Sequence, residues 1–210
     1  MSKFRRFFSA IKDHMAENYG NNKVFITGVS PISLNEFTSG FNIAVNLTHE
    51  LDFSEICGFT KKDLGVALNS IKNGMNFEKM IIDNYDGYKF HSKQREKLIN
   101  PQLCLYFLCH LQKYGEPPSN LMEQNCSMSD SVMEIISKMK HSKGIITKLL
   151  LKPSFNFSTS DKINEKLTVF KIFEEQSEHT TIQLLYYFGA FTICTANTVV
   201  IPNKIIRRST

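Results

Sequence analysis

The scarcity of β-rich segments limits the folds open to this sequence of 210 residues. Residues 24–29, VFITGV, form a short apolar run that is typical of a strand buried on both faces of a parallel sheet. After Pro31 no comparable run follows until residues 191–201. Because a buried strand needs hydrogen-bonded neighbours on both edges, and few candidate neighbours exist, the sequence predicts a mainly α-helical protein with short β elements.

Helical periodicity and capping residues predict most of the remaining structure. Thr60 and Asp63 resemble a capping box, and Asn100 with Pro101 forms a clear helix start, because Asn caps free amides and Pro suits the first helical position. The predicted helices cover residues 60–71, 77–84, 100–113, 129–139, 145–151 and 180–188. We therefore expect a mostly helical region after residue 52.

Residues 3–18 predict a further helix, in which Phe, Ile and Met recur at helical spacing between basic residues. We expect this apolar stripe to pack on the protein's own core. The alternatives to this packing, for a basic amphipathic segment, are a helix that lies on a membrane surface and a targeting peptide.

Two hairpins are expected from the turn residues. Asp86-Gly87 turns the chain into residues 88–90, which can pair back with residues 97–99. Residues 191–194 and 199–201 flank a second predicted turn. The polar residues 33–52 and the Ser/Thr-rich residues 153–161 are predicted as loops.

The charge of the chain narrows the kinds of partner that it could bind. The net charge of +5 permits an acidic partner without demanding one. Basic residues gather at both ends, and if the ends meet they would form a patch for nucleic-acid phosphates. These residues are Lys3, Arg5, Arg6, Lys204, Arg207 and Arg208. No apolar run approaches the roughly 20 residues of a membrane span.

Five cysteines without a CxxC pair predict neither a disulfide framework nor a zinc site, and they favour an intracellular location in the cytoplasm or nucleus. The six histidines are dispersed, so no metal is predicted. The sequence contains no GxxxxGK[ST], GxSxG or HExxH motif, and no catalytic residue is predicted.

Five sequence blocks carry a resemblance to a known family. In order they are KVFITGVSPISLNEFTSGFNIAVNLT, EICGFTKKDL, NYDGYKF, LINPQLCLYFL and LLYYFGAFT with VVIPNKII. Over residues 4–208 the chain resembles the later part of AAA-ATPase-like proteins, which are P-loop NTPases often joined to a PD-(D/E)XK nuclease-like domain. The resemblance implies a remnant of the NTPase α/β core, with one helix and one sheet strand, in residues 1–52. A helical lid with a short hairpin would follow in residues 53–127, and a helical linker that ends in a helix and β-hairpin in residues 128–210.

The resemblance also implies roles for individual residues. Thr27 and Ser30 match the end of the family's core strand, where a hydroxyl can sense a nucleotide's terminal phosphate through a hydrogen bond or a bridging water. A strand-end Thr and a turn Ser are the structural alternative. Other matching positions have structural roles in turns and helix caps. They are Gly28, Gly40, Tyr85, Asp86, Gly87, Tyr88, Asn100 and Pro101.

The departures from the family decide the functional expectation. The Walker A loop, the Walker B strand and the nuclease-like domain are missing, so ATP and magnesium, the cofactors of the parent family, are not expected to be bound by this chain alone. We expect a non-catalytic fragment or a degenerate member of the family that does not hydrolyse ATP by itself. A shortened gene model, a degenerate copy and a free-standing lid would each explain the missing half. The alternatives are an interaction module that docks on a full-length family member or another protein that supplies sheet strands, and a nucleic-acid-binding module that uses the basic ends.

Overall fold

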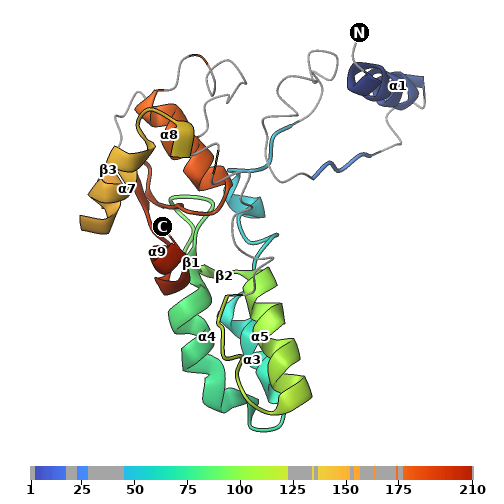
Figure 1. Ribbon diagram of the computed structural model, residues 1–210. Coiled ribbons are helices and arrows are strands. Elements are labelled where there is room, and N and C mark those ends of the chain that lie inside the picture. The colour runs from blue at the N-terminus through green and yellow to red at the C-terminus, as the bar shows by residue number, and fades with distance from the viewer. Residues whose placement is uncertain are drawn as a thin grey trace.

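The computed structural model describes residues 3–17, 23–27, 45–122, 134, 137–151, 154–156, 163, 174 and 177–209. This part of the chain is mainly helical and has two small antiparallel sheets (Figure 1). Its α-helices are α1 (Lys3–Glu17), α3 (Lys61–Asn69), α4 (Glu78–Tyr85), α5 (Pro101–Tyr114), α7 (Ser142–Leu151), α8 (Glu178–Tyr187) and α9 (Lys204–Ser209). Its strands are β1 (Asp86–Tyr88), β2 (Leu98–Ile99), β3 (Ser154–Asn156), β4 (Thr192–Thr195) and β5 (Thr198–Val200), and short 3-10 helices are η2 (Leu51–Phe53) and η3 (Gly74–Phe77). The expectation of a mainly α protein with short β elements is confirmed.

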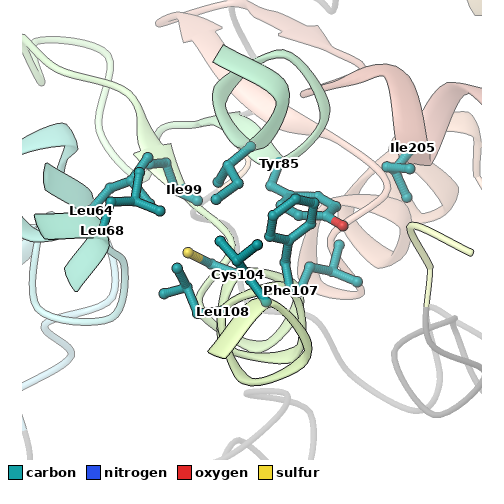
Figure 2. Close-up of a cluster of buried hydrophobic side chains, with 11 residues drawn as sticks. Leu64, Leu68, Tyr85, Ile99, Cys104, Phe107, Leu108 and Ile205 are labelled. Atoms are coloured by element: carbon teal, nitrogen blue, oxygen red, sulfur yellow. The ribbon is translucent and has the colours of Figure 1, made fainter. Parts of the chain in front are cut away.

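A first helical unit forms where α3, α4 and α5 pack together next to the β1–β2 pair (Figure 1). We call its buried cluster the first core (Figure 2). It consists of Leu64, Leu68, Ile81, Tyr85, Ile99, Leu103, Cys104, Phe107, Leu108, Leu111 and, from the last helix, Ile205. Tyr85 and Phe107 meet edge to face with ring centroids 6.1 Å apart. Burial of each such side chain stabilises the unit by about 1.5–3 kcal/mol.

Local signals set the helix ends of this unit as the sequence predicts. The Thr60 hydroxyl accepts a hydrogen bond from the Asp63 amide (3.2 Å), and the Asp63 carboxylate accepts one from the Thr60 amide (2.9 Å). Asn100 caps α5 by accepting a hydrogen bond from the Leu103 amide at 3.1 Å. Gly115, with φ of 76°, ends α5 in the left-handed conformation. The capping box and the Asn-Pro helix start are confirmed.

A second unit contains α7, α8 and a three-stranded sheet of order β3-β5-β4. We call its buried cluster the second core. It consists of Ile145, Ile163, Ile182, Leu185, Tyr186, Ala190, Phe191, Ile193 and Val199. The predicted hairpin of β4 and β5 is confirmed. β3, however, lies within residues 153–161, which were predicted as a loop, and pairs Phe155 with Val199. That prediction is wrong because the partner strand lies more than 40 residues away in sequence, where no local pattern reports it.

The expected strand at residues 24–29 is also wrong for its described part. Residues 23–27 have no regular secondary structure, and Val24 and Phe25 are 45% and 65% exposed. No described strand lies beside them, and an apolar run cannot form a buried strand without neighbours. Gly28 and Val29 lie outside the described residues.

The other expectations have mixed outcomes. The helix predicted over residues 3–18 is confirmed as α1, but Phe7 is 59% exposed and α1 contributes no residue to the described buried clusters, so its expected packing on a core is not found there. The first hairpin is confirmed, although β1 begins two residues earlier than expected.

Most of the helix predicted over residues 129–139 lies outside the described residues. Among the described helices, none is long and apolar enough to cross a membrane.

Candidate functional site

The two units meet where the chain leaves β1. The Lys89 amide donates a hydrogen bond to the Thr192 hydroxyl (2.6 Å), which in turn donates to the Lys89 carbonyl oxygen (2.9 Å). The Ile193 amide also donates to that carbonyl oxygen, at 3.3 Å. We call the contacts of residues 86–90 with residues 189–205 the joint. It links two segments that lie about 100 residues apart in the sequence.

Gly87 and α9 complete the joint on the side of the first core. Gly87 has φ of 135°, and a Cβ atom on it would lie 1.9 Å from the carbonyl oxygen of Pro202. Ile205 of α9 is buried in the first core beside Tyr85 (Figure 2). The Lys204 ammonium lies 3.3 Å from the Asp83 carboxylate of α4. The chain therefore returns from the second unit to the first, and glycine is required where the backbones touch.

A charged hollow of about 340 Å³ opens at this side of the joint. Its ionisable side chains are Asp83, Asp86, Lys97, Lys204 and Arg207. Hydrogen bonds from Lys79 and Lys204 lower the pKa of Asp83, which therefore stays ionised at neutral pH. Three cationic and two anionic groups suit a small anion or a zwitterion better than a metal cation.

A second hollow, of about 200 Å³, lies between the units, and we call it the aromatic cavity. Its ring-bearing residues are Tyr88 and Phe90 from the first unit and Tyr186, Tyr187 and Phe191 from the second. Asn100, Pro101 and the exposed Cys57 also line it. A mostly apolar wall with a few polar groups is the usual composition of a small-molecule site.

The polar groups of the aromatic cavity differ in their hydrogen bonds. The Tyr88 hydroxyl donates to the Gly189 carbonyl oxygen at 3.3 Å, and burial raises its pKa. The Tyr187 hydroxyl lies 3.5 Å from Nε2 of His49, whose pKa is lowered by burial. The Tyr186 hydroxyl is buried and has no hydrogen-bond partner among the residues that the structure describes. Burial also raises its pKa, so it remains a protonated donor.

Five of the ten residues singled out by the family resemblance line the two hollows. Asp86 and Gly87 line the charged hollow, whereas Tyr88, Asn100 and Pro101 line the aromatic cavity. The Tyr85 ring is in the first core, where its hydroxyl donates to the carbonyl oxygen of Leu121 at 2.7 Å. Thr27 is exposed and lines neither hollow. Ser30, Gly28 and Gly40 lie outside the described residues.

Sequence reasoning missed several residues at the joint and beside the aromatic cavity. His49, Tyr186 and Thr192 had no assigned role, since each contacts residues far away in sequence. The aromatic run of LLYYFG was the available signal, since Tyr186 and Tyr187 both line the aromatic cavity. Among the described residues there is no group of three or more His, Cys, Asp or Glu side chains that could hold a metal ion.

Comparison with known proteins gives no relative from which a function could be transferred. No family model matches the chain, no curated protein matches its sequence, and no solved structure matches its fold.

Proposed function

We propose that this chain is a non-catalytic AAA-ATPase-like interaction module, which docks on a complete relative by adding residues 24–27 to the edge of that relative's sheet. The proposed relationship to the family rests on the five sequence blocks. As part of it, we propose that residues 1–52 are a remnant of a P-loop NTPase core. The free thiols of Cys57, Cys104, Cys109 and Cys194 suit an intracellular location, in the cytoplasm or nucleus.

The proposed lack of catalysis rests on the absence of a phosphate-binding loop from the sequence. Hydrolysis by a P-loop NTPase needs a Lys on the phosphates and a Ser or Thr on magnesium, both held by GxxxxGK[ST]. The 210 residues contain no such motif. A protein of this kind would have to act through binding.

The exposed segment 24–27 is the observation that carries the docking proposal. It has the composition of a strand, yet Val24 and Phe25 are exposed and its backbone makes no hydrogen bond with another described residue. An extended peptide that joins a sheet edge gains main-chain hydrogen bonds and buries alternate side chains. A sheet is what a P-loop NTPase offers, so a complete relative is the partner that fits this segment.

A protein partner is preferred to nucleic acid because the basic ends do not form one patch. Figure 1 shows α1, which carries the basic N-terminal residues, well apart from α9, which carries Lys204 and Arg207. A divided positive surface gives weaker phosphate binding than a continuous one.

Two measurements on the purified full chain test the proposal. The first is magnesium-dependent ATP hydrolysis, which should not exceed that of a heat-killed sample. The second is affinity capture from a cell extract, with each captured protein identified by mass spectrometry. We expect a protein that contains GxxxxGK[ST], and we expect Phe25→Asp to abolish its capture.

Phe53→Asp is the matched control, because Phe53 is also an exposed phenylalanine but lies in η2, outside the segment. It should leave capture unchanged. ATP hydrolysis by the chain alone would overturn the non-catalytic assignment. Capture that survives Phe25→Asp, or captured proteins that all lack the phosphate loop, would overturn the docking assignment.

A further inference from the structure

We infer that α1 is an interfacial helix that docks on the surface of a lipid bilayer with anionic headgroups. This surface is separate from segment 24–27 and does not depend on the proposed docking on a sheet. With a rise of about 1.5 Å per residue, the 15 residues of α1 extend over about 22 Å, whereas a helix that crosses a bilayer needs about 20 residues. The helix would therefore lie parallel to the membrane plane with its apolar face against the lipid.

The apolar residues of α1 share one face. Because successive residues of an α-helix are turned by about 100°, four large apolar residues fall within an arc of about 100°, which we call the stripe. They are Phe7, Phe8, Ile11 and Met15. Phe7 is 59% exposed, none of the four belongs to a buried cluster of the described residues, and Figure 1 shows α1 well apart from the helices of both units. A stripe that presents a phenylalanine to water is the kind of surface that a bilayer can cover.

The charges of α1 favour an anionic bilayer. On the same helical wheel Lys12 and His14 lie at the two edges of the stripe, and Asp13 lies on the opposite side. Residues 3–17 contain four Lys or Arg against two acidic residues, and the first turn contains no acidic residue. A lysine at the edge of an apolar face can bury its hydrocarbon chain while its ammonium stays at the level of the headgroups. Each such cation near an anionic membrane surface raises the affinity about fivefold.

A fluorescent reporter on the stripe tests the contact directly. The sequence contains no tryptophan, so a single introduced indole is a specific probe. Phe7→Trp places the indole on the stripe, and Leu105→Trp is the matched control at a 50% exposed position of α5. Vesicles of equal parts phosphatidylcholine and phosphatidylserine should shift the emission of Phe7→Trp to shorter wavelength, because the indole enters the headgroup region. The emission of Leu105→Trp should not change.

Co-sedimentation of the full chain with the same vesicles measures its affinity for lipid. Phe7→Ala keeps the helix propensity and removes the exposed ring, and it should weaken binding roughly tenfold or more. Leu105→Ala should leave binding unchanged. Vesicles of phosphatidylcholine alone should bind at least about fivefold more weakly, and added salt should weaken binding to the mixed vesicles.

Four outcomes would each overturn the inference. They are the absence of vesicle binding, equal binding to the two kinds of vesicle, equal losses in Phe7→Ala and Leu105→Ala, and an emission of Phe7→Trp that vesicles do not shift.

Discussion

Gly87→Ala should destabilise the protein strongly, because it places a methyl group where two backbones touch. The added Cβ would lie 1.9 Å from the Pro202 carbonyl oxygen, far inside van der Waals contact. A backbone atom cannot move aside as a flexible side chain can. β1 would have to separate from the segment that leads into α9.

The size of the effect follows from two contributions. Holding alanine at φ of 135° costs on the order of 1–3 kcal/mol. Separation of β1 from residues 201–203 would withdraw Ile205 from the first core, and full burial of such a side chain is worth about 1.5–3 kcal/mol. We therefore expect a loss of about 3–5 kcal/mol, a large fraction of the 5–15 kcal/mol typical of folded proteins.

Urea unfolding followed by circular dichroism measures this loss. With a slope of about 2 kcal/mol per molar, the midpoint should fall by roughly 1.5–2.5 M. Gly65→Ala is the matched control, because Gly65 lies inside α3 and no neighbouring atom lies within 4 Å of an added Cβ. This control should gain up to about 1 kcal/mol from the higher helix propensity of alanine.

The two glycine variants must move in opposite directions for the reasoning to hold. A Gly87→Ala protein within about 0.5 kcal/mol of the wild type, the usual range for neutral surface changes, would show that the close approach to Pro202 is not present. A loss of the same size in Gly65→Ala would show that the effect belongs to glycine replacement in general and not to the joint.

Two further predictions concern Asn100 and His49. Asn100→Ala should cost about 1 kcal/mol in urea unfolding because α5 loses its cap, whereas Asn100→Asp should retain most of the stability; equal stability of the alanine variant and the wild type would contradict this. Burial lowers the pKa of His49 from 6.5, so at a pH just below 6.5 the unfolded chain binds a proton that the folded protein does not. The free energy of unfolding should therefore be highest above pH 6.5 and decline as the pH falls from 6.5 towards the lowered pKa. His49→Gln should flatten that part of the pH profile of unfolding free energy while His110→Gln should not, and an unchanged profile in His49→Gln would refute the assignment.

The features that could be predicted from the sequence are those fixed by neighbouring residues. A capping box needs only Thr60 and Asp63, and the start of α5 needs only Asn100 and Pro101, so their hydrogen bonds form as expected. The β4–β5 hairpin is local in the same sense. In each case the interacting groups lie within a few residues, and residue types alone specify the geometry.

The features that escaped prediction depend on distant partners. α9 has only six residues, and it is held by Ile205 in a core formed mainly by residues 64–111. Thr192 meets Lys89 across 103 positions, and His49 meets Tyr187 across 138. The candidate site consists of such pairs, so the sequence supplied its turn and cap residues but not the second wall of the aromatic cavity.

A comparison of two apolar runs shows why residue composition alone does not determine burial. β5 contains Val199 and Val200, and Val199 is buried because β3 and β4 pair with both edges of the strand. Val24 and Phe25 are just as apolar, yet they are exposed, and no described strand lies at either edge of their segment. The difference lies in the neighbours, since a strand is stable only when its backbone groups find partners. A second protein that supplied those partners would place residues 24–27 in the environment for which their composition is suited, which is the physical basis of the proposed docking.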